Sequence, residues 1–130
     1  FQAAFFAVNR RTRWVEAEAV KQASAAAAVD FTQRNILNRW GTPAEIRSDQ
    51  GKEYDNALMK TVCKSFGIKK LRTTAYHPQA NGLCEKSHDA IVQDIAKRVS
   101  IDQKDWPLYL SDAIWSSNVQ IHAATGYSPF

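Results

Sequence analysis

Two acidic residues, Asp49 and Glu85, stand in segments whose side chains suit phosphoryl chemistry. Asp49 lies in S-D-Q-G-K-E-Y and Glu85 in Y-H-P-Q-A-N-G-L-C-E-K-S-H, with thirty-five residues between them. A carboxylate at a strand end and another on a helix can share a hard cation such as Mg²⁺. Two such ions about 4 Å apart activate a nucleophile and stabilise the leaving oxygen in phosphoryl transfer.

Simpler interpretations exist for the same residues. An Asp close before Gly51 is a common turn former, and a Glu early in a helix is favoured by the helix dipole. Asn81 and Gly82 form an ordinary turn pair, and Tyr76 suits loop packing. Spacing alone therefore leaves the shared metal site and a purely structural role both open.

The elements that would position the two acids follow from hydrophobic periodicity and turn residues. Strands are predicted at Phe1–Val8, Arg13–Val20, Ala44–Ser48 and Ile68–Thr74. Helices are predicted at Ala25–Trp40, at Asn56–Phe66, from the end of the Tyr76–Gly82 loop to about Ser100, and from Asp105 to about His122. This order of strands and helices indicates an α/β domain with a mixed sheet.

Composition restricts the class of protein. The chain has 130 residues and a net charge of +4, which fits one mildly basic domain that is compatible with a polyanion partner. Its two cysteines, without zinc-ligand spacing, indicate a reduced intracellular protein, nuclear or cytoplasmic. The longest apolar stretch, Ala3–Val8, is too short to span a membrane. The lack of a starting Met predicts a fragment of a longer chain.

Several motifs in order resemble one family. Besides the two segments above, they are V-N-R-R-T-R-W-V-E-A, R-W-G-T-P, W-P-L-Y-L-S-D-A-I-W-S-S-N and H-A-A-T-G-Y-S-P-F. Together they resemble the catalytic core of retroviral and long-terminal-repeat retrotransposon integrases, in particular the gypsy-like group. The resemblance covers nearly the whole chain, so residues 1–130 are interpreted as an integrase catalytic core domain.

The resemblance implies an RNase H-like fold and three catalytic acids, of which Asp49 and Glu85 match the second and third. Both would hold Mg²⁺ or Mn²⁺. The family cuts DNA ends with water and joins the new 3′-hydroxyl to target DNA, so element ends, target DNA and a dimer or higher homo-oligomer are the expected partners. Tyr76 and Asn81 match the loop that meets DNA, and Lys52 falls near the target strand.

The sequence also departs from the family pattern. The first catalytic Asp is expected upstream of Phe1, on a strand that is central in the RNase H-like sheet. Asn9 replaces only a turn residue of the first hairpin. The chain is therefore expected to be N-terminally truncated, to lack the first, central strand of its sheet and to be inactive alone.

Asp89, one turn beyond Glu85, would repel DNA phosphate. The alternative is therefore a domesticated or decayed integrase-derived domain with a nucleic-acid-binding or assembly role; another RNase H-like nuclease is a second rival. Structural interpretations are preferred for the remaining candidates. A solvated strand edge is the preferred interpretation of Lys69, Lys70 and Arg72, and a solvated hairpin tip is that of Arg10, Arg11 and Arg13. Helix core is the preferred interpretation of Cys63, Trp106 and Trp115.

Overall fold

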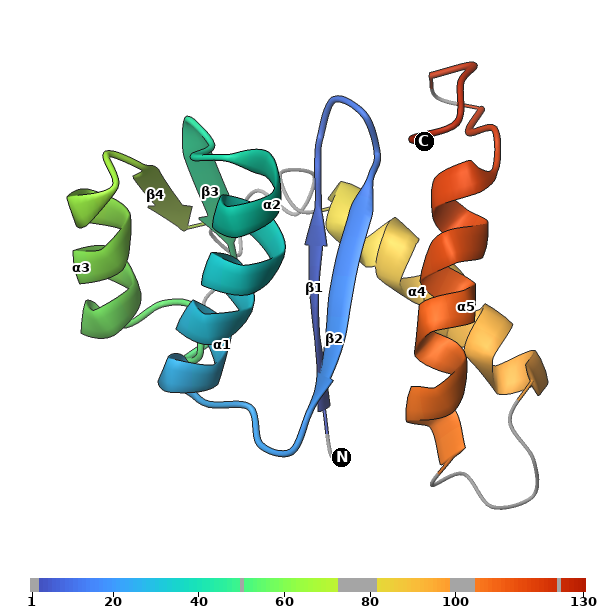
Figure 1. The fold of residues 1–130 in the computed structure, drawn as a ribbon, viewed down its shortest axis with the longest axis horizontal. Coiled ribbons are helices and arrows are strands. Elements are labelled where there is room, and N and C mark those ends of the chain that lie inside the picture. The colour runs from blue at the N-terminus through green and yellow to red at the C-terminus, as the bar shows by residue number, and fades with distance from the viewer. Residues whose placement is uncertain (1–2, 50, 73–81, 99–104, 124) are drawn as a thin grey trace.

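The computed structural model of the chain describes residues 3–49, 51–72, 82–98, 105–123 and 125–130, with the side chains of 82–88 and 98 left out. The strands are β1 (Ala3–Val8), β2 (Val15–Val20), β3 (Glu45–Ser48) and β4 (Lys69–Arg72). The helices are α1 (Ala25–Thr32), a π-helical turn (Gln33–Leu37), α2 (Asn38–Trp40), α3 (Ala57–Ser65), α4 (Gly82–Arg98) and α5 (Trp106–Val119). The predicted order of elements is confirmed (Figure 1).

The first two strands form an antiparallel hairpin in which Ala3 pairs with Val20 and Val8 with Val15. Asn9 makes the turn, because its Oδ1 accepts hydrogen bonds from the backbone N–H groups of Arg11 (2.9 Å) and Thr12 (3.0 Å). Arg13 then takes a positive φ of 69°, a conformation that non-glycine residues adopt rarely. Asn9 is therefore a turn residue, as the sequence predicts.

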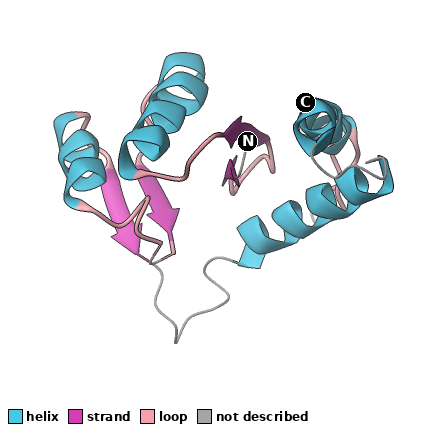
Figure 2. Ribbon diagram, turned by 90° about the horizontal axis from the view of Figure 1, so that it is seen from below, coloured by secondary structure: helices cyan, strands magenta, loops and turns pink. Residues whose placement is uncertain are grey.

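The hairpin separates two hydrophobic cores, because successive side chains of a strand point to opposite faces. Phe5 and Ala7 pack into a core with α1 and α3, whereas Ala4 and Phe6 pack into a core with α4 and α5. Figure 2 shows the hairpin end-on between these two groups of helices. The fully or largely buried members are Phe5, Ala28, Phe31, Leu37, Met59, Cys63 and Ile68 on one side, and Val15, Ile91, Ile95, Leu110 and Ala113 on the other.

The predicted helix Ala25–Trp40 is continuous but contains the π-helical turn Gln33–Leu37. Its start follows the prediction, since the hydroxyl of Ser24 accepts a hydrogen bond from the backbone N–H of Ala27 (3.1 Å). Gly41 ends it with a φ of 83°. A π-helical turn fits one extra residue into a turn of helix, which the apolar spacing of the sequence did not indicate.

The described strands form two sheets rather than one: β1 pairs with β2, and β3 pairs in parallel with β4. Within these described residues, no ladder joins β1 to β3. The free edges of both strands, from Phe6 to Val8 and from Glu45 to Ser48, line a cavity of about 1090 Å³. No described strand lies between β1 and β3, and the expected lack of the central strand of an RNase H-like sheet stays a prediction.

Helix α5 is tied to the hairpin by a buried side chain, Asn118. Its Oδ1 accepts a hydrogen bond from the backbone N–H of Val15 (2.8 Å), and its Nδ2 donates to the Val15 carbonyl (3.0 Å). The amide thus satisfies both backbone groups of a buried strand residue, as a neighbouring strand would.

Two tryptophans of the last helix were predicted to be core residues, and one of these predictions is wrong. Trp106 packs against the second core, but the side chain of Trp115 is 67% exposed. Within the described residues, no helix combines the length and the apolar character that a membrane span requires.

Candidate active site

Asp49 follows directly after β3, at the carboxyl end of a parallel strand. Its side chain is exposed, and its Oδ1 accepts a hydrogen bond from the backbone N–H of Gly51 (2.9 Å). In the described parts of the chain, no hydrogen bond or ion pair engages its other oxygen, Oδ2. Asp49 also lines the cavity between the two sheets. One oxygen is therefore fixed by the turn, and no described residue occupies the other.

Gly51 leaves room for two carboxylates at this turn. A Cβ at Gly51 would lie 2.9 Å from Oδ1 of Asp49 and 3.2 Å from Oε2 of Glu53. The backbone carbonyl of Gly51 accepts hydrogen bonds from the N–H groups of Tyr54 (3.1 Å) and Asp55 (2.8 Å), so the loop is compact. Glu53 was not a candidate in the sequence. Its position four residues after Asp49, with a turn-forming glycine between, was the only indication available.

Lys70 on β4 connects the ends of the two parallel strands. Its Nζ donates hydrogen bonds to the hydroxyl of Ser48, which precedes Asp49, and to the carbonyl of Leu71 (3.3 Å). Burial lowers the pKa of Lys70, and this effect exceeds the opposing influence of nearby Asp55, Cys63 and Asp49. The interpretation of Lys70 as part of a solvated strand edge is therefore wrong, because its amine turns inward.

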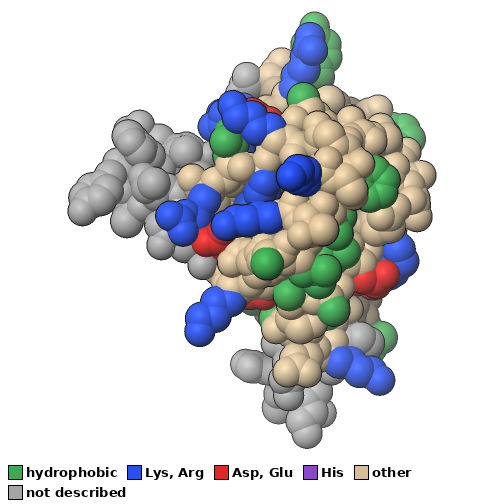
Figure 3. Space-filling model, turned by 90° about the vertical axis from the view of Figure 1, so that its left-hand side faces the viewer, with side chains coloured by type: hydrophobic (Ala, Val, Ile, Leu, Met, Phe, Trp, Pro, Cys, Tyr) green, Lys and Arg blue, Asp and Glu red, His purple; other side chains and the backbone are tan. Residues whose placement is uncertain are grey.

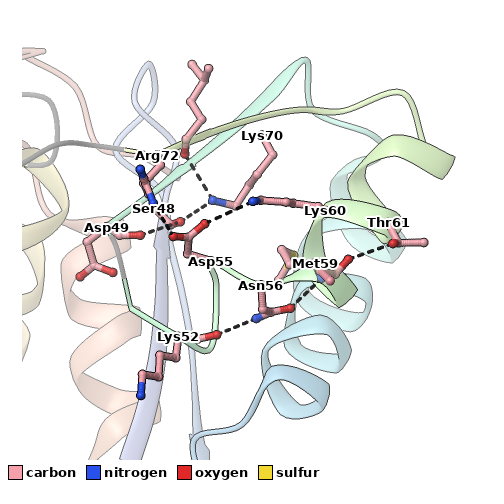
Figure 4. A network of polar contacts seen from close by, with 12 residues as sticks. Ser48, Asp49, Lys52, Asp55, Asn56, Met59, Lys60, Thr61, Lys70 and Arg72 are labelled. Atoms are coloured by element: carbon pink, nitrogen blue, oxygen red, sulfur yellow. Dashed lines mark hydrogen bonds and ion pairs between the residues drawn. The ribbon is translucent and has the colours of Figure 1, made fainter.

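Asp55 connects the same loop to α3 and β4 through ion pairs. Its carboxylate pairs with Arg72 (3.1 Å) and, at a longer distance of 3.9 Å, with Lys60. The hydrogen bond from Arg72 is the main cause that lowers the pKa of Asp55. Figure 4 shows these contacts grouped beside Ser48, with the Asp49 carboxylate pointing away from them. The network therefore holds the strand end without occupying the Asp49 carboxylate.

Lys52 lies in the loop after Asp49, with an exposed side chain that points away from this network (Figure 4). Its backbone carbonyl accepts a hydrogen bond from Nδ2 of Asn56 (2.7 Å), the residue that also caps α3. No described residue pairs with its ammonium group, and its predicted contact with DNA stays a prediction.

Three further predicted residues lie partly or wholly outside the described region. Glu85 falls within α4, but its side chain is outside the described residues; Tyr76 and Asn81 lie outside them altogether. The separation of the Asp49 and Glu85 carboxylates therefore stays a prediction. The helical backbone at Glu85 agrees with the predicted placement of this acid on a helix.

The described side chains alone do not make a complete metal centre, because no group of three or more metal-ligating residues occurs among them. Oδ2 of Asp49, which no described residue engages, is a hard ligand of the kind that Mg²⁺ prefers. Asp49 therefore fits a role as one ligand of a cation that is shared with acids from other segments.

The molecular face next to this loop is basic. Figure 3 shows Lys and Arg side chains gathered on the side of the molecule where α3 and β4 lie. Its exposed basic residues on β3, α3 and β4 are Arg47, Lys60, Lys64, Lys69 and Arg72. Acids partner three of them, Arg47, Lys60 and Arg72, which leaves Lys64 and Lys69 without an ion pair among the described residues.

The sequence model of the integrase core domain matches residues 2–78, a segment that contains the hairpin, β3, Asp49 and β4. The chain belongs to the integrase core domain family. It is 26% identical over 119 residues to the retrovirus-related Pol polyprotein from transposon 412 of Drosophila melanogaster, covering 92% of this chain and 10% of that polyprotein. The integrase core therefore corresponds to a small part of that relative.

Solved structures agree with this assignment. The catalytic core domain of bovine immunodeficiency virus integrase is 26% identical to this integrase core, with a TM-score of 0.75 over 97% of this chain and 81% of that one. The catalytic core of HTLV-2 integrase, solved in a trimeric form in complex with magnesium, is 17% identical, with a TM-score of 0.71 over 94% and 78% of the two chains. The second likeness concerns the fold alone.

Proposed function

We propose that this integrase core, within its complete protein, catalyses DNA 3′-end processing and strand transfer with divalent metal ions. In the first step a water oxygen attacks a phosphodiester near the DNA end, and the bond to the 3′-oxygen breaks to leave a 3′-hydroxyl. In the second step that hydroxyl attacks a target phosphodiester, forms the new bond and releases a target 3′-hydroxyl. The observation that carries this proposal is Asp49, exposed at the end of β3 with one oxygen unengaged by described residues.

Asp49 and Glu85 would hold Mg²⁺ or Mn²⁺, which when bound activates the attacking oxygen and stabilises the leaving one. The chain's own contribution is to position these acids. The Gly51 amide fixes Oδ1 of Asp49, and Lys70 holds the strand end through Ser48. The HTLV-2 core in complex with magnesium supports the choice of metal for this fold. Lys52, Tyr76 and Asn81 are proposed to contact DNA, and a homo-oligomer is proposed as the working form.

The first acid is proposed to come from a strand that pairs between β1 and β3. The two free strand edges along the 1090 Å³ cavity support this placement, since each carries backbone groups that a strand can pair with. The 130-residue chain is then expected to lack strand transfer by itself. Metal-dependent joining of DNA by this chain alone would contradict that expectation.

The direct test is strand transfer of a labelled DNA end by the full-length protein, with Asp49→Asn and Glu85→Gln compared with wild type. Both variants are expected to lose joining while keeping the fold. Asp112→Asn, on the exposed face of α5, removes the same charge and is expected to leave joining unchanged. Equal activity of Glu85→Gln and wild type would refute the catalytic assignment. An inactive wild type that still binds DNA would favour the domesticated or decayed alternative.

A further inference from the structure

The turn of the β1–β2 hairpin carries three arginines that the proposed chemistry does not use. Arg10 and Arg11 are exposed, and Arg13 is half-buried with its guanidinium donating to the carbonyl of Arg10 (2.6 Å). Within the described residues none of the three forms an ion pair, and the buried Nε of Arg13 has no hydrogen-bond partner. The turn therefore presents positive charge that no described acid neutralises.

Aromatic rings lie beside these arginines. Trp14 packs edge-on against Trp40, with ring centroids 5.3 Å apart, and its ring is tilted against Phe130 at 6.3 Å. The side chain of Trp40 is 58% exposed and that of Phe130 is 84% exposed, so large ring areas face solvent. Figure 1 shows the C-terminal end, which carries Phe130, close to the hairpin turn.

A buried carboxylate fixes the two indoles. Glu16 accepts hydrogen bonds from Nε1 of Trp14 and Nε1 of Trp40, both at 2.9 Å, and pairs with Arg39 at 2.9 Å. Glu16 is only 7% exposed, so its negative charge is shielded from anything that approaches the arginines. The indole N–H groups are thus used inside the protein. The guanidinium of Arg39 lies over the Trp40 ring, 5.5 Å from its centroid, and the rest of this half-exposed residue faces solvent.

Rigid exposed aromatic rings next to unpaired arginines match the chemistry of an unpaired polynucleotide strand. Bases stack on aromatic rings whatever their sequence, and guanidinium groups bind the phosphates between them. We propose that the hairpin-tip surface, formed by Arg10, Arg11, Arg13, Trp14, Trp40 and Phe130, binds single-stranded DNA. The sequence alone favoured a merely solvated tip, and the proposal departs from that preference while requiring neither Asp49 nor Glu85.

The test is binding of a short fluorescein-labelled oligothymidine to the chain in EDTA, measured by anisotropy at increasing salt. Arg10→Ala/Arg11→Ala should weaken binding and reduce the salt slope by about 1.4, since each phosphate contact on a single strand contributes about 0.7. Phe130→Ala should weaken binding about fivefold or more with the slope unchanged, because a stacked base is lost. Stacking on Trp40 should also quench tryptophan fluorescence.

The matched control is Lys21→Ala/Lys64→Ala, which removes two exposed positive charges from other elements and should leave affinity nearly unchanged. The proposal would be overturned if this control weakened oligothymidine binding as much as Arg10→Ala/Arg11→Ala does. It would also be overturned if a duplex of the same length bound as tightly as oligothymidine and Phe130→Ala had no effect on binding. The substitutions keep every backbone group of the turn, and circular dichroism checks the fold. Asp49→Asn should bind oligothymidine as wild type does, so failure of binding and failure of strand transfer are separate results.

Discussion

The amine of Lys70 donates a hydrogen bond to the hydroxyl of Ser48, and so joins the ends of two parallel strands immediately before Asp49. The contact places a lysine whose pKa is lowered by burial inside the support of a candidate catalytic acid. A strand end held in this way limits the freedom of the carboxylate that follows it. Stability and activity at this site should therefore respond to changes in residues that do not touch substrate.

Lys70→Met should remove a pH dependence of stability. In wild type the folded state binds a proton at Lys70 less tightly than the unfolded state does, so the free energy of unfolding should rise as pH increases toward the ordinary value of 10.5. The variant should lack this rise, which urea unfolding at a series of alkaline pH values measures. Lys69→Met removes an exposed lysine of the same strand and should retain it. An unchanged rise in Lys70→Met would contradict the assignment.

Asp55→Asn should destabilise the loop at neutral pH but not in acid. The pKa of Asp55 is lowered by Arg72, so its stabilising effect is complete above the ordinary value of 3.8 and is lost as pH falls through the lowered folded value. The difference in urea midpoint between wild type and variant should thus shrink below pH 3.8. Asp112→Asn serves as the exposed control. A difference that persists unchanged in strong acid would argue against the ion pair.

Gly51→Ala should impair strand transfer in the full-length protein. The new Cβ would meet Oδ1 of Asp49 at 2.9 Å, so the carboxylate must move. A displacement of about 1 Å at a reacting group can cost about a hundredfold in rate. Adding Glu53→Ala relieves only the second contact, at 3.2 Å, and should not restore activity. Wild-type joining rates in Gly51→Ala would show that Asp49 tolerates displacement.

Glu16→Gln should lower the free energy of unfolding by about 2 kcal/mol, because a neutral amide replaces a buried carboxylate that accepts from two indoles and a guanidinium. Glu18→Gln is the matched control. Its side chain is 28% exposed and it pairs with the half-exposed Arg34, so the expected loss is below about 1 kcal/mol. Urea unfolding of both variants measures the difference, and equal losses would mean that burial of Glu16 contributes little.

The sequence predicted most elements because their determinants are local. Ser24 and Asn56 cap helices through their own side chains, and Asn9 closes the hairpin turn in the same way. These short-range hydrogen bonds involve residues two or three positions apart, which a pattern of residue types can indicate. Asp49 at a strand end and the helix around Glu85 followed from the same kind of information.

Other features depended on contacts between distant segments. Lys70 and Ser48 are 22 positions apart, so nothing near Lys70 distinguished an inward lysine from a solvated one. Asn118 is buried because it pairs with Val15, whereas the more apolar Trp115 on the same helix is exposed. Side-chain polarity gave the wrong prediction for Trp115, because burial on this helix is decided by the partner across the fold.

The pairing of Asn118 with Val15 also has a consequence for synthesis, because the two residues are 103 positions apart. The hairpin can close as soon as its own short turn leaves the ribosome, but its second face is fully covered only when both α4 and α5 have been made. Nascent chains lengthen at roughly 5–20 residues per second, so that face stays incompletely covered for several seconds. The hairpin's apolar second face is therefore where this integrase core is most open to chaperones, or to aggregation, before release.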